Sequence, residues 1–428
     1  MTDRLNSWVS SANSAETEFP LNNLPYGVFS SVDRSCHCGV AIGDQILDVT
    51  TVADAFDIPA NVFASGAWND FMELGPKTWE SFRAALMDRL AEGTDARLEL
   101  EPHLVAQAEV QLHMPFTVTE FTDFYSGRHH ATNVGTMFRG AGNALPPNWL
   151  HIPIGYNGRA SSIVVSGTDV QRPMGQLKGP NDVLPYFGPS ARFDFELELG
   201  AIVGTPSNGP ISVDQADANI FGYVLLNDWS ARDIQAWEYQ PLGPFQAKAT
   251  ATTISPWIVT TAALAPFRVH APERKFELLD HIKDSGPMLF DIALEVDLTT
   301  ATGKQATISR TNYREMYYSS AQQLAHHTSC GCPMRTGDLL GSGTISGPDK
   351  GSHGSMLELS WGGKEPLSLG HGIFRSFIED GDTISMRGHA IGSGYLIGFG
   401  HCAGTILSAQ ALGFARGIHK GKSRFHLD

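Results

Sequence analysis

The chain lacks any long apolar run. No stretch reaches the roughly 18 consecutive apolar residues that indicate a membrane-spanning helix. The first 19 residues are polar and include Asp3, Glu16 and Glu18, whereas a secretory signal has basic residues followed by an apolar segment. The sequence therefore predicts a cytoplasmic protein that does not act at a membrane.

Basic residues are also scarce. Lys and Arg number 30 against 45 Asp and Glu, which gives a formal net charge of −15. An acidic chain repels the phosphate backbone of nucleic acids unless it carries a local basic stripe, and the sequence has no such stripe. We therefore expect no nucleic-acid partner.

Cysteine is rare, and its five residues are an odd number: Cys36, Cys38, Cys330, Cys332 and Cys402. This count favours free thiols in a reducing compartment over a disulfide framework. Two Cys-x-Cys pairs leave zinc binding open as an alternative. Structural zinc sites usually separate paired cysteines by two to four residues, so we interpret these pairs as incidental thiols.

The composition is that of a large globular protein. Hydrophobic residues make up 42% of the 428 residues, and a chain of this length exceeds the roughly 250–300 residues at which single cores stop growing. It also contains 44 Gly and 24 Pro, which are typical of short strands joined by tight turns. These features predict a mainly β multi-domain protein with some α-helix.

The chain divides into two parts. Residues 26–30 and 39–48 have the pattern of a hairpin with Gly43 and Asp44 at its turn. Between residues 71 and 100, apolar residues recur at helical spacing. A polar, proline-containing stretch then leads to Pro115, so we predict an N-terminal domain over residues 1–115 and a catalytic domain over residues 116–428.

The second part contains many short strand patterns separated by turn signals, which favours a β-sandwich or β-roll over alternating βαβ units. The predicted helices cover residues 229–239 and 316–329. The predicted strands cover residues 162–165, 193–203, 222–227, 254–259, 290–298, 339–345, 356–361, 373–377, 382–387 and 395–399.

Acidic residues alternate with apolar ones in the segment 193–199. A strand would place Asp194, Glu196 and Glu198 on one face, with neighbouring carboxylates about 7 Å apart. A solvated strand face explains this pattern equally well. Asp228, however, ends an apolar strand pattern, and a buried carboxylate of this kind needs a partner.

Hydrogen-bond donors follow Asp228 along the chain. Arg232, Gln235 and Tyr239 share one face of the predicted helix, and Lys248 lies a short loop beyond it. Such donors can stabilise a developing oxyanion. The alternative is that Arg232 only forms a salt bridge with Asp228, four residues earlier.

A third group of polar residues lies in the segment 121–133. It brings together Asp123, Tyr125, His129 and His130 within eight residues. A single histidine is usually an ordinary polar residue, but its concentration with an acid and a phenol indicates a functional site.

Ten ordered motifs, running from about residue 19 nearly to the C-terminus, resemble the fumarylacetoacetate hydrolase family. The segment 36–38 and the tail after Leu407 lie outside the resemblance. The motifs are TDFYS (122–126), HATNVG (130–135), NWLH (148–151), GRASSIVVSG (158–167), NDWSARDIQ (227–235), WEY (237–239), PLGPF (241–245), TTISPW (252–257), SGTISG (342–347) and GSMLELSW (354–361).

The resemblance implies a fold and a reaction. The fold is an N-terminal SH3-like β-barrel followed by a C-terminal mixed β-sandwich or β-roll, assembled as a homodimer. The reaction is the hydrolysis of 4-fumarylacetoacetate to fumarate and acetoacetate, which closes tyrosine and phenylalanine catabolism. A small diketo acid would then be the substrate.

The resemblance also implies roles for residues at matching positions. His130 would be the catalytic base and Glu358 the acid that orients it, although without the resemblance Glu358 reads as an ordinary strand residue. His129 receives no role. The metal ligands would be Asp123, Glu196, Glu198 and Asp228, with Lys248 and Thr252 near a second cation; the oxyanion donors would be Arg232, Gln235 and Lys248; and the substrate contacts would be Tyr125, Arg139, Tyr156, Tyr239 and Thr344. Because all four ligands are carboxylates, we expect Ca²⁺ or Mg²⁺ rather than zinc.

Three other functions are less consistent with the sequence. A related acylpyruvate (diketo-acid) hydrolase or oxaloacetate decarboxylase would share the acidic site, but these enzymes are usually shorter and lack the N-terminal domain. A serine hydrolase would need a Gly-x-Ser-x-Gly elbow, which the sequence lacks. A binding protein on the same scaffold would have lost the acids or His130, and all of these residues are present.

Overall fold

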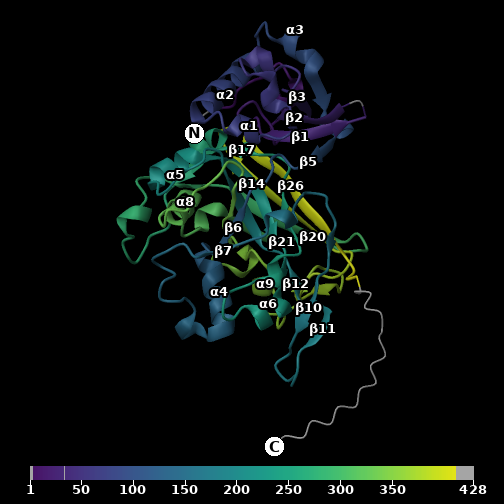
Figure 1. Ribbon diagram of the computed structural model, residues 1–428. Helices are drawn as coiled ribbons and strands as arrows, with labels where there is room; N and C mark the ends of the chain where they lie inside the picture. Colours follow the sequence, from purple (N-terminus) through teal and green to yellow (C-terminus); the bar gives the residue numbers. More distant parts are fainter. Residues whose placement is uncertain (1–2, 33, 411–428) are drawn as a thin grey trace, which may run out of the picture.

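The computed structural model describes residues 3–32 and 34–410. The N-terminal residues gather at one end of the molecule, and the remainder forms a larger body below them (Figure 1). Each part is built on β-sheet with helices around it, and strands predominate over the chain as a whole, which confirms the predicted fold class of mainly β with some α. No helix in the described ranges is long and apolar enough to cross a membrane. The tail beyond residue 410 lies outside the described residues.

The N-terminal part is built on one antiparallel sheet with strand order β4-β3-β2-β1-β5. Its predicted hairpin is confirmed, with Gly43 in the left-handed region at the turn (φ 58°). The SH3-like barrel stays a prediction. The strands are β1 (Tyr26–Ser31), β2 (Arg34–Ile42), β3 (Gln45–Asp48), β4 (Leu104–Ala106) and β5 (Gln111–His113); the helices are α1 (Asn69–Met72), α2 (Pro76–Leu90) and α3 (Arg97–Leu100).

The larger body contains a mixed sheet that carries the site. Its order is β7-β6-β22-β13-β14-β16-β8, and β17 pairs with β14. The pairs β6/β22 and β8/β16 are parallel, whereas the other pairs are antiparallel. The strands are β6 (Phe121–Phe124), β7 (Gly155–Asn157), β8 (Ile163–Val165), β13 (Leu197–Val203), β14 (Ile220–Asp228), β16 (Thr252–Ile254), β17 (Val259–Thr260) and β22 (Leu339–Gly341).

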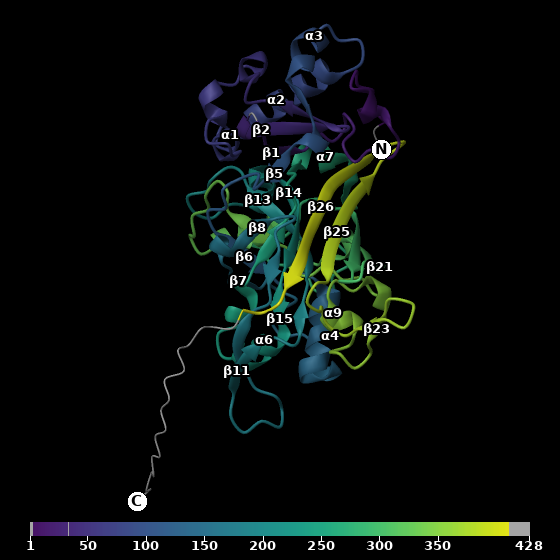
Figure 2. The ribbon, with the colours of Figure 1, turned by 90° about the vertical axis from the view of Figure 1, so that its right-hand side faces the viewer.

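A second sheet packs against β14. Its order is β21-β20-β25-β26-β9, and the long strands β25 and β26 run side by side along the larger body (Figure 2). Leu225 of β14, Leu294 of β20 and Phe399 of β26 belong to one buried cluster, so the two sheets share a core. The strands are β9 (Val170–Gln171), β20 (Ala293–Thr299), β21 (Gln305–Asn312), β25 (Thr383–Ile391) and β26 (Leu396–Leu407).

Short hairpins and helices surround these sheets. The two-stranded pairs are β10 (Met174–Leu177) with β11 (Tyr186–Pro189), β12 (Phe193–Asp194) with β15 (Ser230–Ala231), β18 (Arg268–Val269) with β19 (Leu289–Phe290), and β23 (Leu367–Ser368) with β24 (Phe374–Arg375). The helices are α4 (Arg128–Arg139), α5 (Val213–Asn219), α6 (Arg232–Glu238), α7 (Thr261–Leu264), α8 (Ser320–Thr328) and α9 (Met356–Leu359).

Several element predictions need correction. The helix predicted at 316–329 starts only at Ser320, and the strand predicted at 254–259 is divided between β16 and β17. The strand predicted at 356–361 is wrong, because this segment begins with helix α9: the Asp194 carboxylate accepts the N–H groups of Met356 and Leu357, and Ser355 caps Glu358. The strand predicted at 193–203 is split into β12 and β13. The helix predicted from residue 229 starts only at Arg232, since residues 230–231 pair with β12.

An aromatic cluster joins the two parts of the chain. Tyr26 stacks on Trp68 with 4.4 Å between ring centroids and also contacts Phe71. Phe221, from β14 of the larger body, lies 5.7 Å from Tyr26 and 6.1 Å from Phe71. The N-terminal part therefore shares its core with the strand that ends in Asp228.

Candidate active site

Four carboxylates meet where the strands of the mixed sheet end. Asp123 lies on β6, Glu198 on β13, Asp228 at the end of β14, and Glu196 in the break between β12 and β13. Each offers an oxygen within 4.8 Å of the others, and all four side chains are buried. Asp194 does not join them, so the expectation of three acids on one shared face is wrong. Its carboxylate is occupied by Arg232 and by the first turn of α9.

The residues of this cluster fit a bound cation. Asp123 Oδ1 and Glu198 Oε1 are buried and have no hydrogen-bond partner among the described residues. Burial, together with the neighbouring carboxylates, raises the pKa of Asp123 and Glu198 well above the usual range. The backbone of β22 passes so close to the cluster that a Cβ atom at Gly341 would lie only 2.5 Å from Asp123 Oδ1, so a larger residue would clash with this carboxylate. An all-oxygen set of this kind suits a hard divalent cation.

Two positively charged side chains, Lys248 and Arg232, contact Glu196. The Lys248 ammonium donates to Glu196 and, at 2.5 Å, to Asp228. Arg232 Nη1 lies 2.7 Å from Glu196 Oε1, and its Nε lies 2.8 Å from Asp194. Burial alone would raise the pKa of Glu196, but Lys248 and Arg232 hold it below its usual range. The alternative pairing of Arg232 with Asp228 is not formed, because Asp194 and Glu196 take its place.

The donors predicted for an oxyanion lie beside Glu196. Arg232 Nη1 donates to Gln235 Oε1 at 3.2 Å, one turn along α6. Arg232 Nη2 is buried and has no hydrogen-bond partner among the described residues. The loop that carries Lys248 is held by Glu238, whose carboxylate accepts the N–H groups of Phe245 and Ala247.

His130 and Glu358 form a buried pair next to the acidic cluster. Helix α4 starts after Gly127, where a Cβ atom would lie 2.2 Å from the Thr344 carbonyl oxygen, so only glycine allows the helix to start this close. His130 Nδ1 lies 2.6 Å from Glu358 Oε2, and Nε2 lies 3.7 Å from Glu196 Oε1. Burial alone would raise the pKa of Glu358, but hydrogen bonds and the charge of His130 lower it to about 2.

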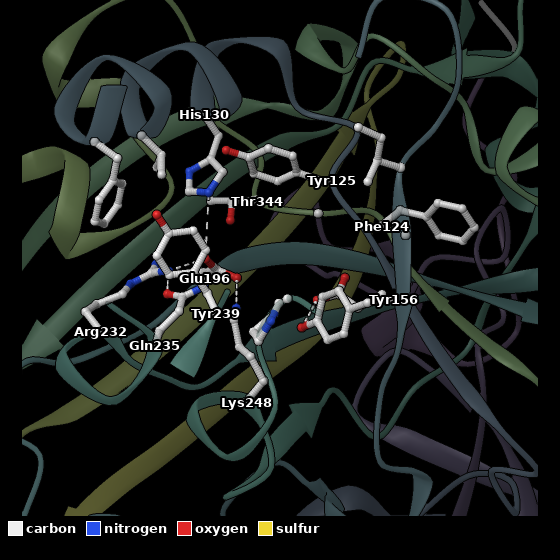
Figure 3. Close-up of a pocket in the computed structure, with 18 of the residues that line it drawn as sticks. Phe124, Tyr125, His130, Tyr156, Glu196, Arg232, Gln235, Tyr239, Lys248 and Thr344 are labelled. Carbon is white, nitrogen blue, oxygen red and sulfur yellow. Dashed lines mark hydrogen bonds and ion pairs between the residues drawn. The ribbon is translucent and has the colours of Figure 1, made fainter. Parts of the chain in front are cut away.

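A cavity of about 330 Å³ brings most of the predicted residues together. Figure 3 shows Glu196 at its centre, with His130, Arg232 and Lys248 around it. The predicted residues that line the cavity are Asp123, Tyr125, His130, Arg139, Tyr156, Glu196, Arg232, Gln235, Tyr239, Lys248 and Thr344. Apolar side chains, among them Phe124, Val134, Phe138 and Leu242, complete the wall.

The other predicted residues lie behind this wall. Glu198 and Asp228 complete the acidic cluster, and Glu358 contacts His130. Thr252 Oγ1 donates to Asp228 Oδ1 at 3.4 Å. The charged ammonium of Lys248 has no lone pair, so this group acts as a hydrogen-bond donor and cannot itself bind a metal ion. The position of Lys248 near a second cation stays a prediction.

Tyr156 and Arg139 contact the wall in different ways. The Tyr156 hydroxyl donates to Asp123 at 2.9 Å, or to Asp228 at 3.2 Å. The Arg139 guanidinium donates to the carbonyl oxygens of Asn143 and Ala144 at the pocket rim. His129 does not line the cavity, and its Nε2 lies 3.6 Å from Glu315.

The cysteine pairs take no part in this site. All five cysteines are free. Among residues 3–32 and 34–410, the group of three or more side chains placed to hold a metal ion is the acidic cluster, which includes none of these cysteines.

Comparison with known proteins agrees with this geometry. Residues 22–115 match the family model described as fumarylacetoacetase N-terminal, and residues 119–406 match the one described as fumarylacetoacetate hydrolase C-terminal. The chain belongs to the fumarylacetoacetase family. Fumarylacetoacetase of Rattus norvegicus is 49% identical over 409 residues, which cover 92% of this chain and 97% of the relative. The Homo sapiens relative is 48% identical with the same coverage, and the Arabidopsis thaliana relative is 45% identical over 92% of this chain and 96% of its own.

Solved structures share the fold at lower identity. The fumarylacetoacetate hydrolase of the psychrophile Exiguobacterium antarcticum has a TM-score of 0.52 at 17% identity, over 90% of this chain and 99% of that one. A maleylpyruvate hydrolase of Sphingobium sp. SYK-6, solved with manganese(II) and pyruvate, has a TM-score of 0.50 at 16% identity, over 90% of this chain and 100% of that one. These similarities support the fold of the family.

Proposed function

We propose that this protein hydrolyses 4-fumarylacetoacetate to fumarate and acetoacetate. The observation that carries the proposal is the buried His130–Glu358 pair, whose free ring nitrogen faces the acidic cluster inside one pocket. Family membership over nearly the full length, including the N-terminal part, supports this substrate over an acylpyruvate or oxaloacetate. The reaction would close tyrosine and phenylalanine catabolism in the cytoplasm. The enzyme would act as a homodimer with domains at 1–115 and 116–428.

His130 acts as the base. Glu358 accepts a hydrogen bond from the Nδ1–H group of His130, which keeps the lone pair on Nε2. Nε2 can then take a proton from water as the water oxygen attacks the carbonyl carbon. The carboxylate then stabilises the imidazolium, as the third member of a hydrolytic triad does. The carbon–carbon bond breaks, its electron pair leaves with acetoacetate as an enolate, and the imidazolium returns the proton to that carbon.

The oxyanion of the attacked carbonyl faces donors on α6 and the following loop. Arg232, Gln235 and Lys248 line the same wall of the pocket, and donors that are already in place stabilise charge without reorganisation. Substrate would contact Tyr125, Tyr156, Tyr239 and Thr344 on the remaining walls, and Arg139 would bind the distal carboxylate.

Asp123, Glu196, Glu198 and Asp228 would hold Ca²⁺ or Mg²⁺, and Lys248 and Thr252 would lie near a second cation. A bound divalent cation supplies Lewis-acid polarisation of the diketone oxygens. The protein's own contribution is to gather four carboxylates side by side, of which Glu196 contacts the Lys248 ammonium and the Arg232 guanidinium and Asp228 contacts the Lys248 ammonium.

The test is the loss of fumarylacetoacetate absorbance with purified protein, before and after exhaustive chelation. We expect activity that chelation removes and that added Ca²⁺ or Mg²⁺ restores. An acylpyruvate and oxaloacetate are assayed in parallel. Faster turnover of either one than of fumarylacetoacetate would overturn the proposal.

A further inference from the structure

The Glu358 carboxylate accepts hydrogen bonds from other side chains as well as from His130. Its Oε2 accepts hydrogen bonds from His130 Nδ1, Ser346 Oγ at 2.9 Å and Ser355 Oγ at 2.8 Å. Its other oxygen, Oε1, accepts from Asn133 Nδ2 at 2.9 Å. Among the described residues, Asn133 is the side chain that anchors this second oxygen.

Asn133 and His130 reach the carboxylate from one helix. They are three residues apart on α4 and therefore share a face. One carboxylate thus spans two side chains of the same helix, with Oε2 on the imidazole and Oε1 on the amide. Fixing both oxygens sets the plane of the carboxylate relative to the ring.

His353 fixes the orientation of the Asn133 amide. Its Nε2 lies 3.2 Å from Asn133 Nδ2, the same nitrogen that donates to Glu358. A carboxylate only accepts, so the amide nitrogen must face Glu358, and its second hydrogen is then directed to His353. His353 must therefore be neutral, with its proton on Nδ1. Burial, the largest influence on this ring, lowers the pKa of His353 and so favours the neutral form.

We infer that Asn133 is a positioning residue of the reaction and that His353 is the acceptor that locks its amide. The inference rests on the proposed function. Without Asn133, Oε1 loses its anchor, and the carboxylate can rotate about Oε2, so that the imidazole is held in its reactive orientation for less of the time. Residues that orient a catalytic group in this way typically change activity by roughly 10–100-fold when removed.

Kinetics of Asn133→Ala test this role. We expect kcat to fall by roughly 10–100-fold with KM nearly unchanged, because Asn133 does not line the substrate cavity. A residue needed only for stability would not separate kcat from KM in this way. Thr132→Ala is the matched control, because that hydroxyl donates to the Arg128 carbonyl of its own helix.

A second pair of variants separates positioning from stability. Gln at position 353 can place an acceptor near Nε2, whereas Leu cannot, so His353→Gln should stay close to wild type and His353→Leu should lose kcat. If Asn133→Ala does not fold, this pair alone decides. Equal kcat in the two His353 variants, or a wild-type kcat in folded Asn133→Ala, would overturn the inference. A wild-type protein that fails to cleave fumarylacetoacetate would instead overturn the proposed function.

Discussion

The acidic cluster and Glu358 bury carboxylates in opposite ways. Burial by itself raises the pKa of all of them. In the cluster, Asp123 and Glu198 keep buried oxygens without donors, and their pKa values stay raised. Glu358 receives four donors, and its pKa falls to about 2. The first arrangement is incomplete without a cation, whereas the second is complete within the protein.

Removing the base tests the complete arrangement and should have the largest effect. His130→Ala should lower kcat by about 10²–10⁴-fold, because a positioned general base contributes that much. Metal content, measured by elemental analysis, should remain, since His130 is not among the four clustered acids. His129→Ala is the control, because its ring lies near Glu315 outside the cavity. If only His129→Ala is inactive, the base has been assigned to the wrong histidine.

Removing one acid tests the incomplete arrangement. Glu198→Gln should lower both bound metal and activity, because ligand charge sets the affinity for hard cations. Glu198 is fully buried and its Oε1 lacks a donor, so the neutral side chain should not unfold the protein. Elemental analysis and the absorbance assay check this prediction together. Full activity after exhaustive chelation would contradict a role for the cluster in metal binding.

Weakening the contact with the substrate's distal carboxylate should lower activity less than the two changes above. Arg139→Lys should raise KM more than it lowers kcat, because lysine loses the bidentate contact with the distal carboxylate in the ground and transition states alike. Steady-state kinetics with the same substrate measure both constants. A collapse of kcat at constant KM would place Arg139 in the chemistry itself.

The pH dependence of stability should show the smallest of these effects, and it concerns the acidic cluster. Asp123 and Glu198 have folded pKa values raised above their unfolded values of about 4, so their stabilising contribution is present below pH 4 and is lost as pH rises through the folded pKa values. The difference in Tm between metal-loaded and metal-free protein should therefore widen as pH rises above about 4. In Glu198→Gln this widening should be weaker. A constant difference across the range would show that the raised pKa values do not govern metal binding.

The sequence predicted the acidic half of the site better than the helical half. Alternation within 193–199 placed Glu196 and Glu198 together, and the end of an apolar strand marked Asp228. The same reasoning made a strand of 356–361, although the N-cap residue Ser355 with Glu358 three residues later is a local signal for the start of a helix. The first two N–H groups of α9 also donate to Asp194, which lies 162 residues away from Met356 in the chain. Local patterns carry no information about such a partner.

The pairing of base and acid was equally hidden from local reasoning. His130 and Glu358 are 228 residues apart, and only resemblance to the family connected them before the structure did. The helical spacing of His130 and Asn133 was visible in the sequence, but it gains meaning only when one carboxylate is seen to accept from both. Motif resemblance therefore supplied the residues, and the fold supplied their contacts.

The path of β14 has a consequence for cooperativity. The strand has nine residues: Phe221, near its start, packs in the N-terminal aromatic cluster, and Asp228, its last residue, belongs to the acidic cluster. Because one continuous strand contacts both clusters, we expect its two ends to open together. Amide hydrogen exchange along β14 should thus report one unfolding unit, and a destabilising change at Trp68 should speed exchange next to the acids without touching them.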